Sequence, residues 1–179
     1  MILQKFAHQL DRFSHQLNRL ALWGAVLAVL VMLGAAGWQV IARYLLSQPP
    51  VWTEELARFA MVWAGLLGAS CAFRTHSDPT LFVNMQKKMG QLGLVLSLIR
   101  TFGALAFITP ILWFSFFGAN MNPARSYIAR LTARNAETMD LPMTVFGIAI
   151  PIAFTLIFIH LLAHLAQRLK KQPASLSEG

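Results

Sequence analysis

One long stretch without charge constrains this chain more than any other feature of its sequence. Residues 20–42, between Arg19 and Arg43, contain no Asp, Glu, Lys or Arg over 23 positions. A helix of that length rises by about 35 Å, enough to cross the ~30 Å hydrocarbon core of a bilayer. The apolar region of a secretory signal peptide spans only roughly 7–15 residues, so we expect a retained membrane span.

The composition excludes an ordinary soluble domain. Hydrophobic residues make up 56% of the 179 positions and charged residues only 12%, against about 25% charged in typical soluble proteins. The single cysteine, Cys71, cannot form an internal disulfide or a Cys-based zinc site. A net charge of +8 fits cytoplasmic segments that face anionic lipid, and nucleic acid is the weaker interpretation.

Three further apolar segments follow the first, at about residues 53–73, 90–118 and 141–162. Pro110 and Pro151 predict bends in the last two, which lipid-embedded helices tolerate. The fold class is therefore an all-α integral membrane protein, with four transmembrane helices in a domain at residues 20–164. Residues 120–140 have room for a short interfacial helix, and residues 165–179 read as a basic, disordered cytoplasmic tail.

The distribution of basic residues predicts the orientation of the four spans. Nine Lys and Arg residues lie in the N-terminal segment, the second loop and the tail, and five lie in the first and third loops. The nine are Lys5, Arg12, Arg19, Arg74, Lys87, Lys88, Arg168, Lys170 and Lys171, and the five are Arg43, Arg58, Arg125, Arg130 and Arg134. Because cytoplasmic loops carry the excess of positive charge, we expect both termini in the cytoplasm.

The segment at residues 1–19 contains a seven-residue repeat. Residues 8–14 read HQLDRFS and residues 15–21 read HQLNRLA, which places apolar residues at 3, 6, 10, 13, 17 and 20. This spacing forms one stripe on a helix and predicts an amphipathic helix resting on the membrane surface. A coiled-coil seam with a partner fits the same spacing, but it normally needs three or four heptads.

A charged and aromatic cluster lies between the first two spans. Its members are Arg43, Tyr44, Trp52, Glu54, Glu55 and Arg58. Glu54 and Glu55 precede Arg58 by four and three residues, a spacing that favours ion pairs on a helix. A self-neutralised turn at the interface explains these residue types. A partly desolvated network that fixes the two spans to each other and to a partner protein is the alternative that we favour.

The spans carry two other notable features. Ala64, Gly68 and Ala72 are spaced as small-xxx-small on the second span, so a helix of this chain or of another protein could approach closely there. Arg100 lies inside the third apolar segment, where it must either reach the interface or meet an acceptor.

The sequence provides little chemistry for an independent activity. No Asp or Glu falls in the middle of a span, although an independent ion-driven transporter would need a site near the bilayer midplane. A four-helix membrane cytochrome needs histidines on facing helices, but His160 and His164 lie on one helix. We expect no catalytic residues, no metal site and no cofactor in this chain.

The run 52–58 (WTEELAR), preceded by Arg43, Tyr44 and Pro49 and followed by Trp63 and Gly68, resembles the small membrane subunit of TRAP transporters, the DctQ/SiaQ type. The resemblance extends through Pro142 and Pro151 to about residue 162. It implies four spans in a bacterial inner membrane, with both termini cytoplasmic. Between residues 74 and 88 the sequence departs from the pattern common in the family, since His76 is followed by Ser77, Asp78 and Pro79.

The resemblance also implies partners and a role. Such a subunit scaffolds a large multi-span subunit that carries substrate and coupling Na⁺, and it contributes to docking a soluble periplasmic binding protein. The uptake system takes in an organic acid such as a C4-dicarboxylate, sialic acid or another sugar acid. The substrate is not determined by this chain, because the small subunit is not the one that binds it.

Overall fold

The computed structural model describes residues 2–75 and 91–175. Within these ranges four helices are long and apolar enough to cross a membrane, which confirms the all-α, four-span fold class. They belong to α1 (Ile2–Tyr44), α2 (Trp52–Thr75), α4 (Gln91–Phe116) and the pair α6 (Thr144–Gly147) and α7 (Ala149–Ser175). Large apolar side chains such as Leu20 and Trp23 are exposed along α1, as expected of a surface that lipid solvates.

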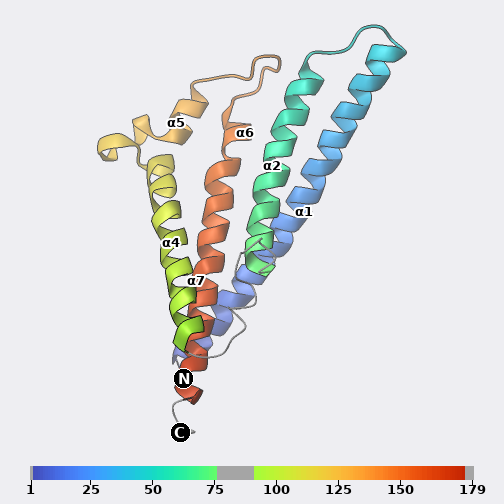
Figure 1. Cartoon of the computed structure of the whole chain (residues 1–179). Helices are drawn as coiled ribbons and strands as arrows, with labels where there is room; N and C mark the ends of the chain where they lie inside the picture. The colour runs from blue at the N-terminus through green and yellow to red at the C-terminus, as the bar shows by residue number, and fades with distance from the viewer. Residues whose placement is uncertain (1, 76–90, 176–179) are drawn as a thin grey trace.

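The helices are arranged so that both ends of the described chain lie together. α1 and α2 run side by side as an antiparallel pair, and α7 contacts α1, α2 and α4 (Figure 1). We call the end of the bundle with the N- and C-termini the terminal end, and the opposite end, with α5 and α6, the loop end (Figure 1). At the loop end α4 diverges from the α1–α2 pair, whereas α6 stays beside α2 (Figure 1).

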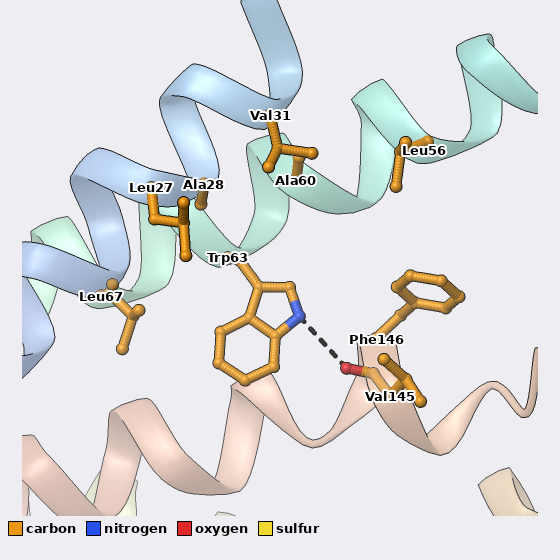
Figure 2. A pocket seen from close by; sticks show the side chains of 10 residues that line it. Leu27, Ala28, Val31, Leu56, Ala60, Trp63, Leu67, Val145 and Phe146 are labelled. Atoms are coloured by element: carbon orange, nitrogen blue, oxygen red, sulfur yellow. Dashed lines mark hydrogen bonds between the residues drawn. The ribbon is translucent and has the colours of Figure 1, made fainter. Parts of the chain in front are cut away.

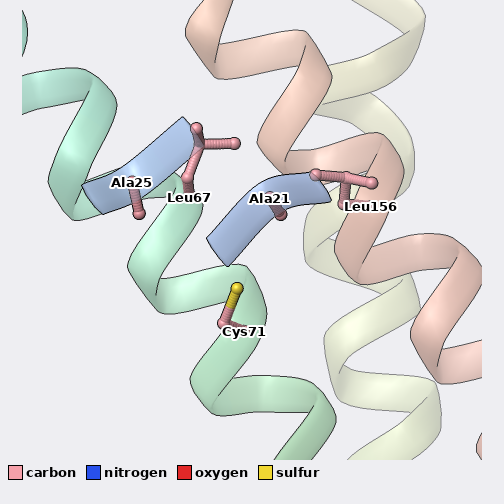
Figure 3. Close-up of a cluster of buried hydrophobic side chains, with 5 residues drawn as sticks. All are labelled: Ala21, Ala25, Leu67, Cys71 and Leu156. Atoms are coloured by element: carbon pink, nitrogen blue, oxygen red, sulfur yellow. The ribbon is translucent and has the colours of Figure 1, made fainter. Parts of the chain in front are cut away.

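Small residues on α1 allow α2 to pack closely against it. Ala21 and Ala25 are buried together with Leu67 and Cys71 of α2 and Leu156 of α7 (Figure 3). A Cβ atom added at Gly24 would lie 2.9 Å from the Leu67 Cδ1 atom, so the Leu67 side chain would have to shift to admit a larger residue there. The core is therefore thin and seam-like, as in membrane helix pairs whose outer faces are in lipid.

The first helix is longer than the sequence analysis predicts. The separate surface helix expected at residues 1–19 is instead continuous with the first span in α1, which is 43 residues long. The repeat contains no Gly or Pro to interrupt the helix. Its apolar stripe is also divided, because Leu10 and Leu17 are half-buried while Phe13 is exposed.

The last helix is also longer than predicted. The tail expected to be disordered from residue 165 continues α7 as far as Ser175. Residues 165–172 read LAQRLKKQ, and all of these residue types are strong helix formers, which outweighed the Pro and Ser content farther on. Residues 176–179 lie outside the described ranges.

Proline has different effects in the two later spans. α4 continues through Pro110, whereas the fourth span is broken at Ile148, between α6 and α7. Pro151 lacks the backbone N–H that would bond to the carbonyl four residues earlier, which explains a break at this place. The bend expected near Pro151 is thus present as a helix break, and residues 141–143 precede the helix.

The segment between α4 and α6 is built from turns. It contains η1 (Ala119–Met121), η2 (Pro123–Arg125) and α5 (Tyr127–Thr132). Gly118 has a φ of 65°, and a Cβ atom there would lie 2.6 Å from the Arg125 carbonyl carbon, so only glycine fits this turn. The Ser126 hydroxyl accepts a hydrogen bond from the Ala129 N–H, which caps the short helix predicted in residues 120–140.

The loop whose sequence departs from the family pattern can be described only at its beginning. Arg74 and Thr75 end α2. Residues 76–90, which include His76, Asp78, Lys87 and Lys88, lie outside the described ranges.

Candidate functional site

The charged cluster at the loop end divides into two parts that face different directions. Glu54 and Arg58 form an ion pair of 3.9 Å between Oε1 and NH2, and their side chains are 64% and 65% exposed. The spacing rule therefore predicted this pair correctly. At such exposure the pair contributes only about 0–1 kcal/mol.

Glu55 faces the interior, and it is not paired with Arg58 as the spacing suggested. Its residue is only 6% exposed. One carboxylate oxygen accepts the backbone N–H of Glu137 at 2.9 Å, and the other accepts the backbone N–H of Thr138 at 2.8 Å. The Thr138 hydroxyl donates to the second oxygen as well. Backbone and hydroxyl donors, rather than an arginine, therefore satisfy this buried charge.

The segment that Glu55 binds is a short hairpin-like loop. Asn135 and Pro142 form an isolated antiparallel bridge, and the Met143 N–H donates to the Arg134 carbonyl at 2.9 Å. The N–H groups of Glu137 and Thr138 lie at the turn of this loop, where no paired strand can accept them. Glu55 supplies the missing acceptor, so the carboxylate fixes the loop to the start of α2.

One face of α2 continues the contact below Glu55. Phe59, four residues later, stacks on Phe146 with ring centroids 4.0 Å apart. Trp63, four residues further, donates its indole N–H to the Val145 carbonyl at 3.2 Å (Figure 2). Residues at positions i, i+4 and i+8 share a helix face, so α2 binds both ends of the segment at residues 137–146 through one stripe. We call Glu55, Phe59 and Trp63 the loop-end clamp.

The remaining members of the predicted cluster are not brought to this clamp. Tyr44 is 77% exposed and Trp52 is 42% exposed. Arg43 is also exposed, and among the described residues it forms no ion pair. The single four-charge network expected here is therefore not formed. Whether any of these residues contacts a partner protein stays a prediction.

The small-residue face and the intramembrane arginine have distinct surroundings. Ala64, Gly68 and Ala72 are half-buried, and a Cβ atom added at Gly68 would meet no atom within 4 Å. At Gly68, contacts within the described chain thus do not fill this face. The Arg100 guanidinium lies over the Phe73 ring of α2, 5.3 Å from its centroid, a cation–π contact that links α4 to α2.

A second polar cluster at the terminal end joins three helices. Arg74, at the end of α2, bonds to the Asp11 carboxylate at 2.8 Å and donates to the Ser14 hydroxyl at 2.6 Å. The Ser14 hydroxyl lies 2.7 Å from Nδ1 of His160 on α7. Ser14 and His160 are fully buried. We call Asp11, Ser14, Arg74 and His160 the terminal-end network.

This network was not predicted from the sequence. Arg74 was assigned to a loop and residues 1–19 to the membrane surface, and His160 was considered only as a possible haem ligand. The available signal was the repeat itself, where Asp11 and Ser14 lie three residues apart on one helix face. Their partners lie 63 and 146 residues away, so only the tertiary arrangement shows that this face is buried.

The described residues offer little support for a metal or haem site. No group of three or more His, Cys, Asp or Glu side chains that could hold a metal ion is found among them. His160 uses Nδ1 toward Ser14, and the Arg74 guanidinium on the other side of Ser14 makes the surroundings unfavourable for a cation. His160 and His164 are on the same helix, α7.

Comparison of the sequence with known protein families assigns the chain to one of them. The sequence model of the DctQ component of tripartite ATP-independent periplasmic transporters matches residues 32–171. The chain belongs to the DctQ family. Members of this family are transporter subunits and not enzymes. Because the chain also has four helices that can span a membrane, it is a multi-pass protein of the bacterial inner membrane.

A curated relative is consistent with this assignment. The chain is 38% identical over 79 residues to the sialic acid TRAP transporter small permease protein SiaQ of Vibrio cholerae serotype O1. The matched region covers 43% of this chain and 42% of the relative, so the chain spans less than half of that relative's length.

The residues that match the DctQ family include all of the loop-end clamp but only part of the terminal-end network. Glu55, Phe59 and Trp63 and the loop they hold all lie within residues 32–171. Arg74 and His160 of the terminal-end network also lie there, whereas Asp11 and Ser14 precede the matched residues. The terminal-end network therefore joins the part that matches the family to the N-terminal extension of α1.

Proposed function

We propose that this DctQ-family chain is the small permease subunit that scaffolds a large multi-span TRAP subunit in the bilayer and helps dock a periplasmic substrate-binding protein. The complex drives Na⁺-coupled uptake of an organic acid, either a C4-dicarboxylate, sialic acid or another sugar acid. The coupling Na⁺ binds in the large subunit, and this chain carries no cofactor. The name of the Vibrio cholerae relative favours sialic acid within this class.

The loop-end clamp is the observation that supports a docking role. A surface that receives a soluble protein must hold its shape, because ordering a mobile loop on binding weakens the complex. Glu55 satisfies the turn of the loop, and Phe59 and Trp63 fix the following residues to α2. Arg130 and Arg134 are exposed beside this loop and suit an acidic partner surface.

The sidedness of the bundle is part of the proposal. The nine-to-five distribution of basic residues supports cytoplasmic termini and a periplasmic loop end. In a Cys71→Ser background, a cysteine at Ser47 should react with a membrane-impermeant reagent added to intact cells, whereas one at Ser175 should react only after lysis. Equal labelling of both cysteines in intact cells would contradict this orientation.

An independent small transporter is the less favourable alternative. Within the described residues, Asp11 lies toward the terminal end of α1, and Glu54 and Glu55 lie in the first turn of α2. No described carboxylate therefore occupies the middle of a spanning helix, where a coupling-ion site would be needed. This distribution favours a subunit that acts with a transporting partner.

Reconstitution tests the proposed function directly. The chain should copurify in a one-to-one ratio with a large multi-span TRAP subunit. Uptake into liposomes should require both chains, the binding protein and an inward Na⁺ gradient. Full uptake by the large subunit without this chain would contradict the scaffold role, and uptake by this chain alone would support the independent transporter.

A further inference from the structure

An apolar groove lies between α1, α2 and α6 and is not filled by any described side chain. Its volume is about 460 Å³, and its walls include Leu27 and Ala28 of α1, Leu56 and Trp63 of α2 and Val145 of α6. Figure 2 shows these side chains around a common space, with Trp63 near its centre. Leu27 is 62% exposed and Val145 is 48% exposed, so the groove opens sideways toward the surroundings of the helices.

The chemistry of the walls restricts what can occupy the groove. Trp63 provides the one side-chain polar group among the lining residues, and its indole N–H is already bonded to the Val145 carbonyl. An occupant therefore needs neither charge nor hydrogen-bonding capacity. Apolar cavities exclude water and accept apolar ligands, and the groove lies within segments that can span the membrane.

The dimensions of the groove fit a hydrocarbon chain better than a helix. Leu56 and Leu67 both line it, and these residues are about 16 Å apart along α2 at 1.5 Å per residue. One leaflet of a bilayer contributes about 15 Å of hydrocarbon, half of the ~30 Å core. A helix about 10 Å across and of the same length would occupy roughly 1,300 Å³, so it could place only its side chains in the groove, whereas an acyl chain can lie in it along its length.

We propose that this groove binds one acyl chain of a membrane phospholipid from the leaflet at the loop end. The chain enters beside Leu56, one turn below Trp52, and extends past Trp63 toward Leu67. Bound in this way, the lipid fills the space between the α1–α2 pair and α6 without disturbing the bond from Trp63 to Val145. This assignment does not rest on the proposed function.

Trp63 provides a direct probe of the bound lipid. In the full chain with Trp23, Trp38, Trp52 and Trp113 changed to Phe, the remaining tryptophan lines the groove. This chain is reconstituted with phosphatidylethanolamine that carries dibrominated acyl chains, and the bulk lipid is then exchanged for unbrominated detergent. Bromine quenches indole fluorescence on contact. We expect Trp63 to remain quenched, with about one phospholipid retained per chain.

Filling the groove tests whether the retained lipid occupies it. Ala28→Phe and, independently, Val31→Phe should abolish both the residual quenching and the retained phospholipid. Ala36→Phe adds the same ring at an exposed position of α1 outside the groove and should leave both unchanged. Circular dichroism and gel filtration verify that each variant is folded.

Two results would overturn the proposal. One is a loss of quenching in the unsubstituted chain as soon as the bulk lipid is removed. The other is equal lipid retention in the groove-filling variants and in Ala36→Phe. If the unsubstituted chain retains no lipid and the filling variants fail to bind the large subunit, the groove is a protein contact instead. If the unsubstituted chain retains the lipid but does not support uptake in the reconstituted system, that result would count against the proposed function and not against the lipid site.

Discussion

The two ends of the bundle both bury a charged side chain, but they satisfy it in different ways. At the loop end, the Glu55 carboxylate is bound by the N–H groups of a turn, without an arginine. At the terminal end, Arg74 pairs with Asp11 and is linked through Ser14 to His160. The first arrangement fixes a loop to one helix, and the second fixes three helices to one another.

This difference predicts different consequences of damage at each end. Loss of the Glu55 carboxylate frees a turn whose amides can be hydrated, because Glu137 and Thr138 are themselves exposed. Loss of Arg74 leaves Asp11 and Ser14 of α1 without their common partner, and Ser14 and the His160 side chain bonded to it are fully buried. The terminal end should therefore determine global stability, and the loop end should determine local order and docking.

The largest effect is expected from Arg74→Gln. The Arg74 and Asp11 side chains are 12% and 34% exposed, so removing Arg74 should cost about 2 kcal/mol, between the values for exposed and buried pairs, and Arg74 also donates to the buried Ser14 hydroxyl. The free energy of unfolding, measured by SDS titration in mixed micelles, should fall by about that amount. In the double variant Asp11→Asn, Arg74→Gln the loss should be less than the sum of the single losses.

Arg12→Gln is the matched control for Arg74→Gln. Arg12 neighbours Asp11 in sequence but is exposed, so its replacement should change stability by less than about 0.5 kcal/mol. Equal effects of the two substitutions would show that the terminal-end network contributes no more than surface charge.

The next largest effect is expected from Glu55→Gln, and it should be local. The amide nitrogen of glutamine cannot accept a hydrogen bond, so at least one of the two backbone N–H groups loses its acceptor. A spin label at Asp140, in a Cys71→Ser background, should become more mobile. Glu54→Gln, one residue away on the exposed face, should leave the label unchanged. Equal mobility in both variants would remove the basis for a clamp.

The sequence predicted the spans well because their signal is local. Residues 20–42 need only be free of charge to be assigned to the membrane, and Pro49 and Pro50 separate them from the next helix. Glu54 and Arg58 were paired correctly by helical spacing alone. The beginning of α1 was predicted wrongly because the amphipathic repeat was interpreted as a separate surface helix. The end of α7 was predicted wrongly because the composition of the tail was interpreted as disorder, although residues 165–172 are strong helix formers.

The clusters were harder to predict because their partners are distant in sequence. Glu55 bonds to residues 82 and 83 positions away, and backbone N–H groups carry no signature of residue type. Ser14 and His160 are 146 positions apart. A helical repeat shows that one face differs from another, but it does not tell whether that face meets lipid, water or a second helix.

A smaller effect is expected from Trp63→Phe. Phenylalanine keeps an aromatic ring against the groove but lacks the indole N–H that bonds to the Val145 carbonyl. A single neutral hydrogen bond contributes about 1 kcal/mol, so the free energy of unfolding should fall by that order. Trp52→Phe is the control at a more exposed tryptophan and should cause a smaller change. If Trp52→Phe lowered the free energy of unfolding more than Trp63→Phe, the more stabilising tryptophan contact would lie outside the loop-end clamp.

The smallest effect is expected at Glu54 and Arg58, although the sequence gives them the best charge pattern of the cluster. Their ion pair is 3.9 Å long and its side chains are about two-thirds exposed, so Glu54→Gln or Arg58→Gln should cost at most about 0.5 kcal/mol in the isolated chain. The charge-reversed pair Glu54→Arg, Arg58→Glu should be less stable by under about 1 kcal/mol, because it places a base in the first turn of α2. A marked loss of copurification with the large subunit in either single variant, at unchanged stability of the isolated chain, would mean that a partner buries this pair. The exposed face of α2 would then be the contact with that partner. The loop end would thus hold a charge pair buried between two proteins, in addition to the Glu55 carboxylate buried within this chain.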